Sequence, residues 1–476
     1  MVFSSYEFIF IFLPVVLVGY FCTHKKMMLQ NIILVAASLF FYAYFNVSYL
    51  VIILASIIAN YLFAHAISRF NDERRGLSRF FCIVAVLFNL GLLGYYKYFD
   101  FFVENINSVF NADFNLKNII LPLGISFFTF QQLSFVISVY KKEEKVEDIL
   151  TYSLFVSFFP QLVAGPIVSY SEMIPQFLDK SRRRFNSDNF SVGLYTFALG
   201  MFKKAVVADT LNLFVSNGYA QDELTSAAAG WVVSLSYTLQ IYFDFSGYSD
   251  MAIGLGKMFN IDLPVNFNSP YKSASISEFW KRWHITLGRA LRNFVYIPLG
   301  GNRKGRLRTY INYLITFLLS GLWHGASWTF VLWGGLNGIC IVIEKIFSKV
   351  LNKIPKVIKI AFTFLVTNAL WVLFRAESFD KAIGIYSAML NFKNIGFDSI
   401  APLAADGIMG LPSLIATAYV TGLIAIALCV VFFTKNVVEK SKEFKPTTRN
   451  MLITAAALVL SVLFISRESV FIYFNF

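Results

Sequence analysis

Ser320-Gly-Leu-Trp-His-Gly-Ala-Ser-Trp328 lies in a stretch that contains no Asp, Glu, Lys or Arg between Arg308 and Glu344. A run this long and this apolar is typical of segments that enter a bilayer, so it predicts membrane helices on both sides of the motif. An ionisable side chain at that depth is costly unless it is paired or faces water. His324 is therefore the first candidate functional residue.

A second motif, Glu278-Phe-Trp-Lys-Arg-Trp-His284, resembles the first in placing a histidine after a tryptophan. The chain has only 4 histidines, and of these His284 and His324 alone follow tryptophan. Imidazole has an unperturbed pKa of about 6.5, which suits proton transfer near neutral pH. The two motifs predict a histidine pair at a reactive site.

Composition places the whole chain in the membrane. Hydrophobic residues make up 57% of the 476 positions and charged residues only 14%, against roughly a quarter in soluble proteins. The net charge of +13 falls largely in short basic loops, which is typical of the positive-inside bias and not of nucleic-acid binding. The four cysteines are scattered singly, so no metal site is expected.

Taking about 20 apolar residues per crossing, we expect one integral-membrane domain over 1–476 with thirteen apolar spans. The spans are placed at 7–22, 29–45, 49–68, 80–97, 119–139, 150–168, 190–214, 230–248, 309–323, 326–344, 357–374, 412–433 and 450–466. Prolines and glycines in 119–168 predict broken or re-entrant helix there, and the first apolar run is expected to be retained as a span.

Loop charge predicts the orientation of the chain. Basic loops at 24–26, 69–79, 182–184, 345–359 and 435–449 should face the cytoplasm, whereas the acidic connections at 100–113 and 377–406 should lie outside. Both the N-terminus and the C-terminus are then extracytoplasmic. We expect a multi-pass protein of the bacterial cytoplasmic (inner) membrane.

The segment 262–308 carries too many charges for a lipid-facing span. An amphipathic helix is expected to begin near Ser277 and Glu278 and to continue through Leu287 and Leu291. Two interpretations stay open: an interfacial helix that lies on anionic lipid, or a cytoplasmic platform that receives an anionic cosubstrate. The last segment, 450–476, is expected to form a final span followed by an aromatic tail.

At these residues the chain resembles the membrane-bound O-acyltransferase family, in its bacterial alginate-O-acetylase-like branch. Further matching motifs run in order along the chain: Tyr242-Phe-Asp-Phe-Ser-Gly-Tyr-Ser-Asp250, Tyr296-Ile-Pro-Leu-Gly-Gly-Asn-Arg303, Trp371-Val-Leu-Phe-Arg375 and Phe471-Ile-Tyr-Phe-Asn-Phe476. The resemblance implies an all-α ring of about 11–13 tilted transmembrane helices around a central funnel, with re-entrant and interfacial helices. It also implies transfer of an acyl group, usually acetyl, from a cytoplasmic thioester towards an extracytoplasmic polysaccharide.

The resemblance assigns roles to the two histidines. His324 would be the general base, and His284 would orient the acyl carbonyl or donate a hydrogen bond to the oxyanion. The competing interpretation for each is a buried histidine held by a nearby polar group. Glu278, Trp283 and Trp323 are expected to support the site.

Charged residues form two further groups. Asp244 and Asp250 must be paired or raised in pKa if buried, and we expect them to organise the funnel or to pair with Arg289 and Arg292 rather than to relay protons. Cations of the platform would meet the phosphates of acetyl-CoA, the expected cosubstrate, or lipid headgroups. These cations are Arg282, Arg289, Arg292, Arg303 and Lys304.

The C-terminal tail has four aromatic residues in its last six positions, so it is unlikely to remain in water. This tail resembles a terminal motif of a related D-alanylating system. There the motif lies on a small companion protein, and its tyrosine accepts the acyl group. By that resemblance Tyr473 would take acetyl with His324 as base, and present it to an extracytoplasmic SGNH-type (hydrolase-fold) transferase. An aromatic plug that anchors the terminus is the alternative.

The sequence thus predicts a membrane O-acetyltransferase that has no permanently bound cofactor and no nucleic-acid partner. Two other functions remain: transfer of D-alanine or another acyl group to teichoic acid or peptidoglycan, and proton-coupled transport along an intramembrane His/Asp path. Transporters often show internal repeats, and none is visible here.

Overall fold

The computed structural model describes residues 1–404 and 412–465, and within these ranges the regular structure is helical with no strand. Six helices are long and apolar enough to cross a membrane in the described part of the chain. They are Ser48–Phe70, Arg75–Phe110, Ser187–Ala220, Trp328–Ile346, Lys356–Arg375 and Ser413–Phe433. The expectation of an all-α polytopic membrane protein is confirmed.

The chain divides into two compact units, which are described separately. Unit 1 comprises Met1–Phe197 and Met251–Pro264, and unit 2 comprises Ala198–Asp250 and Val265–Phe476. Two long helices, α10 (Ser187–Met201) and α12 (Ala227–Met258), contribute residues to both units. The predicted single domain and its ring of helices around a funnel stay predictions.

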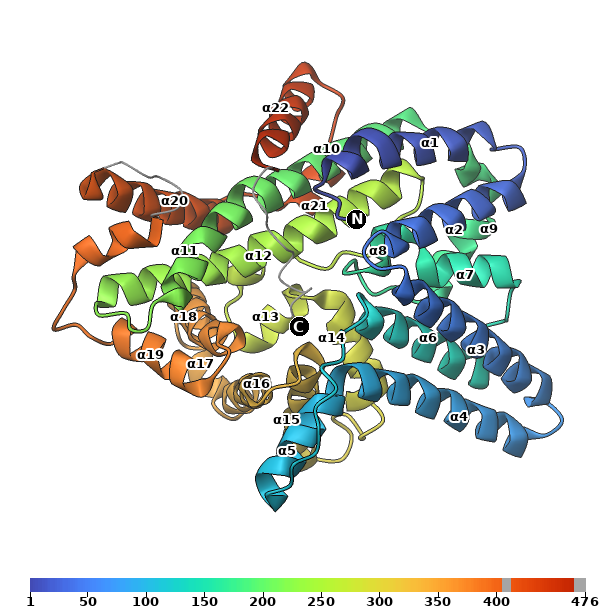
Figure 1. Ribbon diagram of the computed structural model, residues 1–476, viewed down its shortest axis with the longest axis horizontal. Helices are drawn as coiled ribbons and strands as arrows, with labels where there is room; N and C mark the ends of the chain where they lie inside the picture. The colour runs from blue at the N-terminus through green and yellow to red at the C-terminus, as the bar shows by residue number, and fades with distance from the viewer. Residues whose placement is uncertain (405–411, 466–476) are drawn as a thin grey trace. The chain divides into compact units, whose positions relative to one another are not determined.

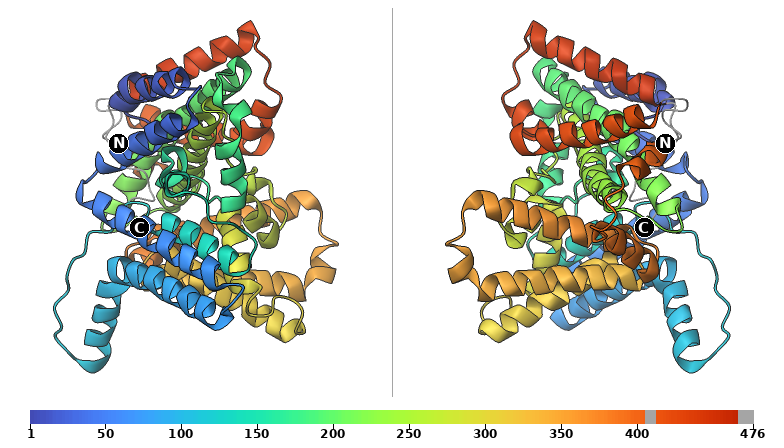
Figure 2. Two further views of the ribbon diagram at one scale, coloured as in Figure 1. Left: turned by 90° about the vertical axis from the view of Figure 1, so that its right-hand side faces the viewer. Right: turned by 90° about the vertical axis from the view of Figure 1, so that its left-hand side faces the viewer.

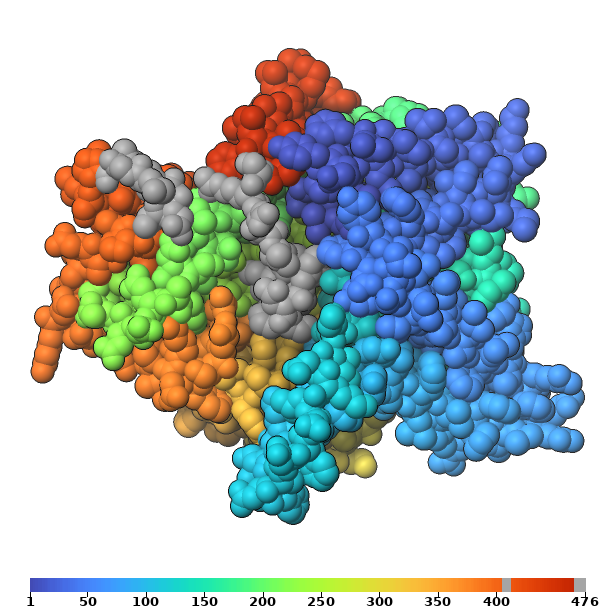
Figure 3. All heavy atoms as spheres, in the orientation of Figure 1, coloured from blue at the N-terminus to red at the C-terminus, as the bar shows by residue number. Residues whose placement is uncertain are grey.

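Unit 1 is built from apolar helices of varied length. They are η1 (Phe8–Phe12), α1 (Leu13–Cys22), α2 (Met27–Ala43), α3 (Ser48–Phe70), α4 (Arg75–Leu93), η2 (Gly94–Tyr98), α5 (Phe99–Phe110), α6 (Ile125–Tyr140), α7 (Ile149–Ser157), α8 (Phe159–Leu162), α9 (Tyr170–Leu178) and η3 (Lys180–Arg183). Within this unit, α5 and the extended segment that follows it project away from the other helices in side view and in the space-filling view (Figures 2 and 3).

Buried amides lock the helices of unit 1 together. Asn60 on α3 and Asn89 on α4 exchange two side-chain hydrogen bonds of 3.2 and 2.6 Å, and both side chains are fully buried. Between apolar helices in lipid there is little hydrophobic drive for association, so such reciprocal bonds fix the register of α3 against α4.

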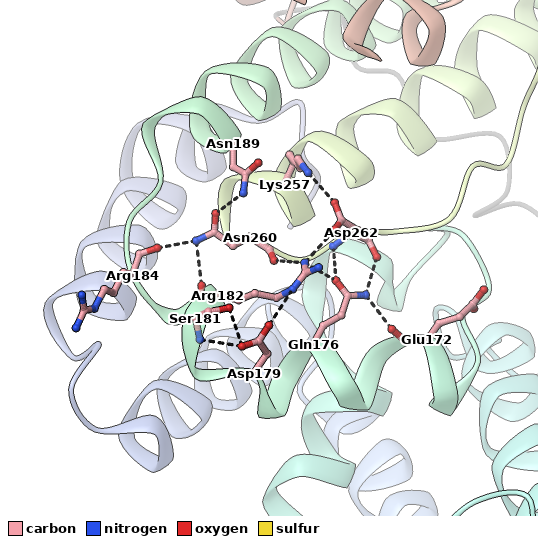
Figure 4. A network of polar contacts seen from close by, with 10 residues as sticks. All are labelled: Glu172, Gln176, Asp179, Ser181, Arg182, Arg184, Asn189, Lys257, Asn260 and Asp262. Carbon is pink, nitrogen blue, oxygen red and sulfur yellow. Dashed lines mark hydrogen bonds and ion pairs between the residues drawn. The ribbon is translucent and has the colours of Figure 1, made fainter.

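A polar network in unit 1 joins η3 to the segment that follows α12 (Figure 4). The guanidinium of Arg182 donates to the Gln176 side chain, to the Asn260 carbonyl and to the Asp262 carboxylate, each at 2.9 Å. Lys257 also pairs with Asp262 at 2.8 Å. The basic residue predicted for a cytoplasmic loop thus ties η3 to the segment after α12.

Unit 2 contains the remaining helices. They are η4 (Phe202–Ala208), α11 (Asp209–Ala220), η5 (Pro270–Lys272), α13 (Ile276–Arg282), α14 (Ile285–Leu291), η6 (Arg292–Tyr296), α15 (Arg306–His324), α16 (Trp328–Ile346), α17 (Ser348–Leu351), α18 (Lys356–Arg375), α19 (Phe379–Met389), η7 (Phe397–Ala404), α20 (Ser413–Phe433), α21 (Val437–Lys442) and α22 (Thr448–Phe464). Every predicted span therefore contains helix, and 150–168 is broken into α7 and α8 as expected.

Two glycines allow α15 and α16 to pack as a close hairpin (Figure 1). A Cβ atom added at Gly321 would lie 2.2 Å from the Phe330 carbonyl oxygen, and one at Gly334 would lie 2.2 Å from the Phe317 carbonyl oxygen. Neither position can carry a side chain without separating the helices. This contact fixes the end of α15, where His324 lies.

The structure corrects the prediction of one amphipathic helix from Ser277 to Leu291. Helix α13 is capped by Ser275, whose side chain accepts from the Glu278 amide, and it ends at Arg282. His284 has a φ of 45° in the left-handed region, so the helix cannot continue through it. The amide of Ile285 bonds instead to the Asn266 carbonyl at 3.0 Å, and α14 starts there.

Candidate functional site

His324 is the last residue of α15 and is 2% exposed. It therefore lies at the turn between α15 and α16, in the gap between the predicted spans 309–323 and 326–344. Irregular backbone in an apolar surrounding is tolerated where protein encloses it, and both His324 and Gly325 are buried. The turn presents imidazole in an enclosed position at a helix end.

The second histidine of the pair comes from the break between α13 and α14. His284 is 1% exposed, and its ring centroid lies 6.5 Å from that of His324 at an interplanar angle of 62°. The structure thus brings together two residues that are 40 positions apart in the sequence. A small group placed between the two rings could contact both.

Asn266 fixes the protonation pattern of His284. The side-chain oxygen of Asn266 accepts from the Thr286 amide at 3.2 Å and from the Thr286 hydroxyl at 3.0 Å, which identifies that atom as oxygen. It also lies 3.1 Å from Nδ1 of His284, so Nδ1 carries the proton and Nε2 is the acceptor in the neutral ring.

Burial keeps His284 neutral. The residue lies between two short helices, outside the membrane-length helices, and burial lowers its pKa to about 3. A neutral ring with Nδ1 protonated has a lone pair on Nε2. His284 can therefore accept a proton or a hydrogen bond through Nε2, whereas donation to an oxyanion, one of its two predicted roles, would require the other tautomer.

An aromatic cage surrounds the histidine pair. The ring of His324 lies 4.9 Å from Trp323, 5.2 Å from Trp333 and 5.3 Å from Phe374, measured between centroids. His284 meets Phe245 edge-on at 4.8 Å. Such walls exclude water and lower the local dielectric constant, which strengthens every electrostatic interaction at the site.

Behind the cage, tryptophans form a continuous packed layer. Trp283 is fully buried and lies 4.9 Å from Trp371, which stacks on Trp333 at 5.6 Å. The indole of Trp371 donates to the Tyr271 hydroxyl at 3.1 Å, and that hydroxyl donates to the Thr238 carbonyl at 2.6 Å. Trp283 belongs to this layer and Trp323 to the cage, and their role in supporting the site stays a prediction.

Asp244 and Asp250 take partners that the sequence did not suggest. Asp250 pairs with Lys203 at 2.6 Å, and Asp244 pairs with Lys204 at 2.8 Å. Lys204 also pairs with Asp209 at 2.7 Å. The cation that meets Asp250 is thus Lys203 of η4, and the expected role of the two aspartates in organising the funnel stays a prediction. Two adjacent lysines in an apolar span were the signal that could have found them.

The predicted donor-binding cations lie on one segment between α13 and α15. Arg282 is partly buried and pairs with Glu278 at 2.8 Å, and Glu278 also accepts from the Ala274 amide at 2.8 Å. Glu278 thereby caps α13 and orients Arg282. Arg289 is half-buried on α14.

The other three cations of this segment are solvent-facing. Arg292, Arg303 and Lys304 are exposed, and none makes an ion pair with a residue that the structure describes. Their charges are therefore available to an anion. Tyr473 lies outside the described residues.

Sequence reasoning missed several residues that shape the site. Asn266 gave no periodic signal because it belongs to the irregular segment after α12. Trp333 lies within the predicted span 326–344, and Phe374 lies within the motif Trp371–Arg375. Neither pattern predicts a contact with His324. Their role depends on which rings meet around His324, which is a property of the folded chain.

The chain matches the model of the membrane-bound O-acyltransferase family over residues 137–376. That range contains His284, His324 and the platform segment. It also contains the two lysines of η4 and the two aspartates of α12 with which they pair.

Three relatives illustrate the similarity. The peptidoglycan O-acetyltransferase of Helicobacter pylori is 39% identical across 100% of this chain and 98% of its own length. A probable alginate O-acetylase AlgI of Pseudomonas aeruginosa is 40% identical across 82% of this chain and 75% of its own. The teichoic acid D-alanyltransferase of Bacillus subtilis is 25% identical across 49% of this chain and 61% of its own.

With the family model covering half of its length and relatives matching nearly all of it, this chain belongs to the membrane-bound O-acyltransferase family and is an O-acyltransferase.

Proposed function

We propose that the protein takes acetyl from cytoplasmic acetyl-CoA and passes it across the bacterial cytoplasmic membrane for O-acetylation of an extracytoplasmic polysaccharide. The observation that carries the proposal is the buried pair of His284 and His324, 6.5 Å apart in an aromatic cage. The identity of 39% to a peptidoglycan O-acetyltransferase along the whole chain supports acetyl as the group and a wall polymer as the final acceptor.

The donor is proposed to approach from the platform segment. Acetyl-CoA carries several phosphates, and exposed arginines are well suited to phosphate because their planar guanidinium can donate two parallel hydrogen bonds. Arg282, Arg289, Arg292, Arg303 and Lys304 supply five positive charges on 282–304, of which one is paired with Glu278.

Acyl transfer requires that a hydroxyl lose its proton as its oxygen attacks the thioester carbonyl. In our proposal, His324 accepts that proton while the new C–O bond forms. The tetrahedral intermediate then breaks its C–S bond, and the proton passes from His324 to the departing thiolate. His284 lies beside this step with its Nδ1 proton committed to Asn266, so it positions the reacting groups and does not remove the single hydroxyl proton.

The acceptor hydroxyl is proposed to be that of Tyr473. A phenol of pKa about 10 needs a base to become nucleophilic, and an acetyl ester on the tail can be presented on the outer side. An extracytoplasmic SGNH-type transferase would then move acetyl to the polysaccharide. This part rests on the resemblance to systems with a terminal tyrosine motif.

D-alanyl transfer is the weaker alternative, because the D-alanyltransferase of Bacillus subtilis matches only 49% of the chain and at 25% identity. Family membership leaves the transporter hypothesis without support.

The test is to incubate purified protein with acetyl-CoA labelled in the acetyl group, and to locate the label by peptide mass spectrometry. Label on the peptide that contains Tyr473, and its absence in His324→Ala and Tyr473→Phe, is the expected result. The matched control is His65→Ala, because His65 is an exposed histidine on α3 in unit 1. A fully active Tyr473→Phe variant would exclude the carrier role, and labelling by D-alanyl thioester but not acetyl-CoA would exclude acetyl.

A further inference from the structure

A separate cavity of about 470 Å³ lies in unit 2 among η4, α11, α20, α21 and α22. Its volume is within the range of roughly 300–1,000 Å³ that is typical of small-molecule sites. Neither His284 nor His324 lines it, so it is distinct from the histidine cage.

One wall of the cavity is a single face of α20. Tyr419, Leu423, Ala427 and Val431 contribute to it, and their spacing of four residues places them on one side of the helix. The twelve residue steps from Tyr419 to Val431 span about 18 Å at 1.5 Å per step. That length is close to half of the roughly 30 Å hydrocarbon core, which is the depth of one leaflet.

The two ends of the cavity differ in chemistry. At one end the rings of Phe214 and Tyr419 meet edge-on at 6.3 Å. At the other end Lys435, Asn436 and Lys440 line the cavity, where α20 gives way to α21. The cavity is thus apolar along its length and cationic at one end.

The charge at the cationic end is only partly balanced. Lys203 also lines the cavity, but it is paired with Asp250. Lys435 pairs with Glu443, and both of these side chains are exposed, so solvent screens that pair. Lys440 makes no ion pair with a residue in the described ranges, and its pKa is lowered by burial and by nearby Lys203. An anion at this end would relieve the repulsion between the two ammonium groups.

Loop charge places this end in the cytoplasmic leaflet. The segment 435–449 has five cations (Lys435, Lys440, Lys442, Lys445 and Arg449) and two anions (Glu439 and Glu443), a net charge of +3. Anionic lipids of the cytoplasmic leaflet attract such basic segments.

We propose that this cavity binds one anionic phospholipid, with an acyl chain along α20 and the phosphate at Lys435 and Lys440. The occupant is a lipid because the lining is apolar over the depth of one leaflet and the polar groups are confined to its headgroup end. This proposal does not depend on the identity of the acyl donor or acceptor.

The test is native mass spectrometry of the full-length protein, delipidated in detergent and then titrated with phosphatidylglycerol or with phosphatidylethanolamine of matched chains. Phosphatidylglycerol is expected to bind with one-to-one stoichiometry and more tightly than phosphatidylethanolamine. In the Lys435→Gln/Lys440→Gln variant its affinity should fall about 30-fold, because each lysine near the headgroup contributes about fivefold to the affinity.

Two further variants separate the cavity from the surface. Lys442→Gln removes an exposed cation from the same short helix but outside the cavity, and it should bind like the wild type. Ala427→Trp fills the cavity, since Ala427 is 6% exposed and lines it, and it should abolish the one-to-one complex. If Ala427→Trp does not fold, the lysine variants still decide the question.

Three results would overturn the proposal. Equal affinity for the two lipids would show that the lysines do not select the headgroup. A loss of affinity in Lys442→Gln equal to that in Lys435→Gln/Lys440→Gln would assign binding to general surface charge. Displacement of the lipid by coenzyme A at comparable concentration would assign the cavity to the donor. A photoreactive acyl chain should label α20 and not the lipid-facing side of α3.

Discussion

The histidine cage and the lysine–aspartate cluster are both buried polar groups in unit 2, but they are built in opposite ways. His284 and His324 lie among aromatic rings, with Trp323 near both and with Trp333 and Phe374 against His324. Lys203 and Lys204 meet three aspartates at 2.6–2.8 Å. A histidine enclosed by aromatic rings can exchange a proton with a bound group. The lysine–aspartate pairs instead hold their helices together.

If the cage is where the chemistry occurs, His324→Ala should have the largest effect of any single change. Loss of the general base is expected to reduce acetyl transfer by about 10²- to 10⁴-fold. Initial rates with labelled acetyl-CoA, compared with His65→Ala, measure the effect. Near-wild-type activity would remove His324 from the mechanism.

The charged cluster should respond in stability. Lys203→Met leaves the Asp250 carboxylate buried without its partner, and breaking a buried pair in this way costs about 3–5 kcal/mol of unfolding free energy. Lys203→Met/Asp250→Leu should recover most of that loss, because no isolated charge remains. Thermal unfolding in detergent measures both variants. Equal destabilisation by the single and double changes would argue against a structural pair.

Asn266 tests whether the tautomer of His284 matters. Asn266→Leu removes the acceptor for Nδ1 of His284 and for the amide and hydroxyl of Thr286, and the loss of the hydrogen bond to His284 should slow transfer by about 5- to 150-fold. Asn266→Asp keeps an acceptor but adds a negative charge, which raises the pKa of His284. Its activity should therefore decline at a higher pH than that of the wild type as the solution is acidified. An unchanged pH profile would reduce Asn266 to a packing residue.

The neutral state of His284 should also be visible in stability. Its folded pKa of about 3 lies below the ordinary histidine value of 6.5, so the unfolded chain binds more protons between these pH values. The contribution of His284 to the free energy of unfolding is therefore fully present above pH 6.5 and is lost as the pH falls towards 3. The decline in melting temperature from pH 7 to pH 5 should be smaller in His284→Gln, and the same slope in both proteins would contradict the burial argument.

The platform cations should have the smallest effect. Each exposed arginine contributes about 0.2–1 kcal/mol to binding of an anion, so Arg303→Gln should raise KM for acetyl-CoA by about 1.5- to 5-fold without changing kcat. High salt should reduce the difference. Lys345→Gln, an exposed cation at the end of α16, is the control and should leave KM unchanged.

Residue patterns predicted the helices well and their interruptions less well. The apolar run 49–68 corresponds to α3 and the run 357–374 to α18, because in lipid the backbone must satisfy its own hydrogen bonds and long apolar runs have little choice. The break at His284 was not predicted. It depends on Asn266, which lies in another part of the chain and supplies the bonds that replace the helix.

Composition and the length of apolar runs are local properties, so residue patterns alone predict a helical membrane protein with two Trp-His motifs of unusual placement. The fold adds that the two histidines meet, that Asn266 sets the tautomer of one, and that Lys203 and Lys204 pair with the aspartates of α12. These are contacts between distant segments, and their free energy depends on distance and burial, which no single stretch of sequence specifies.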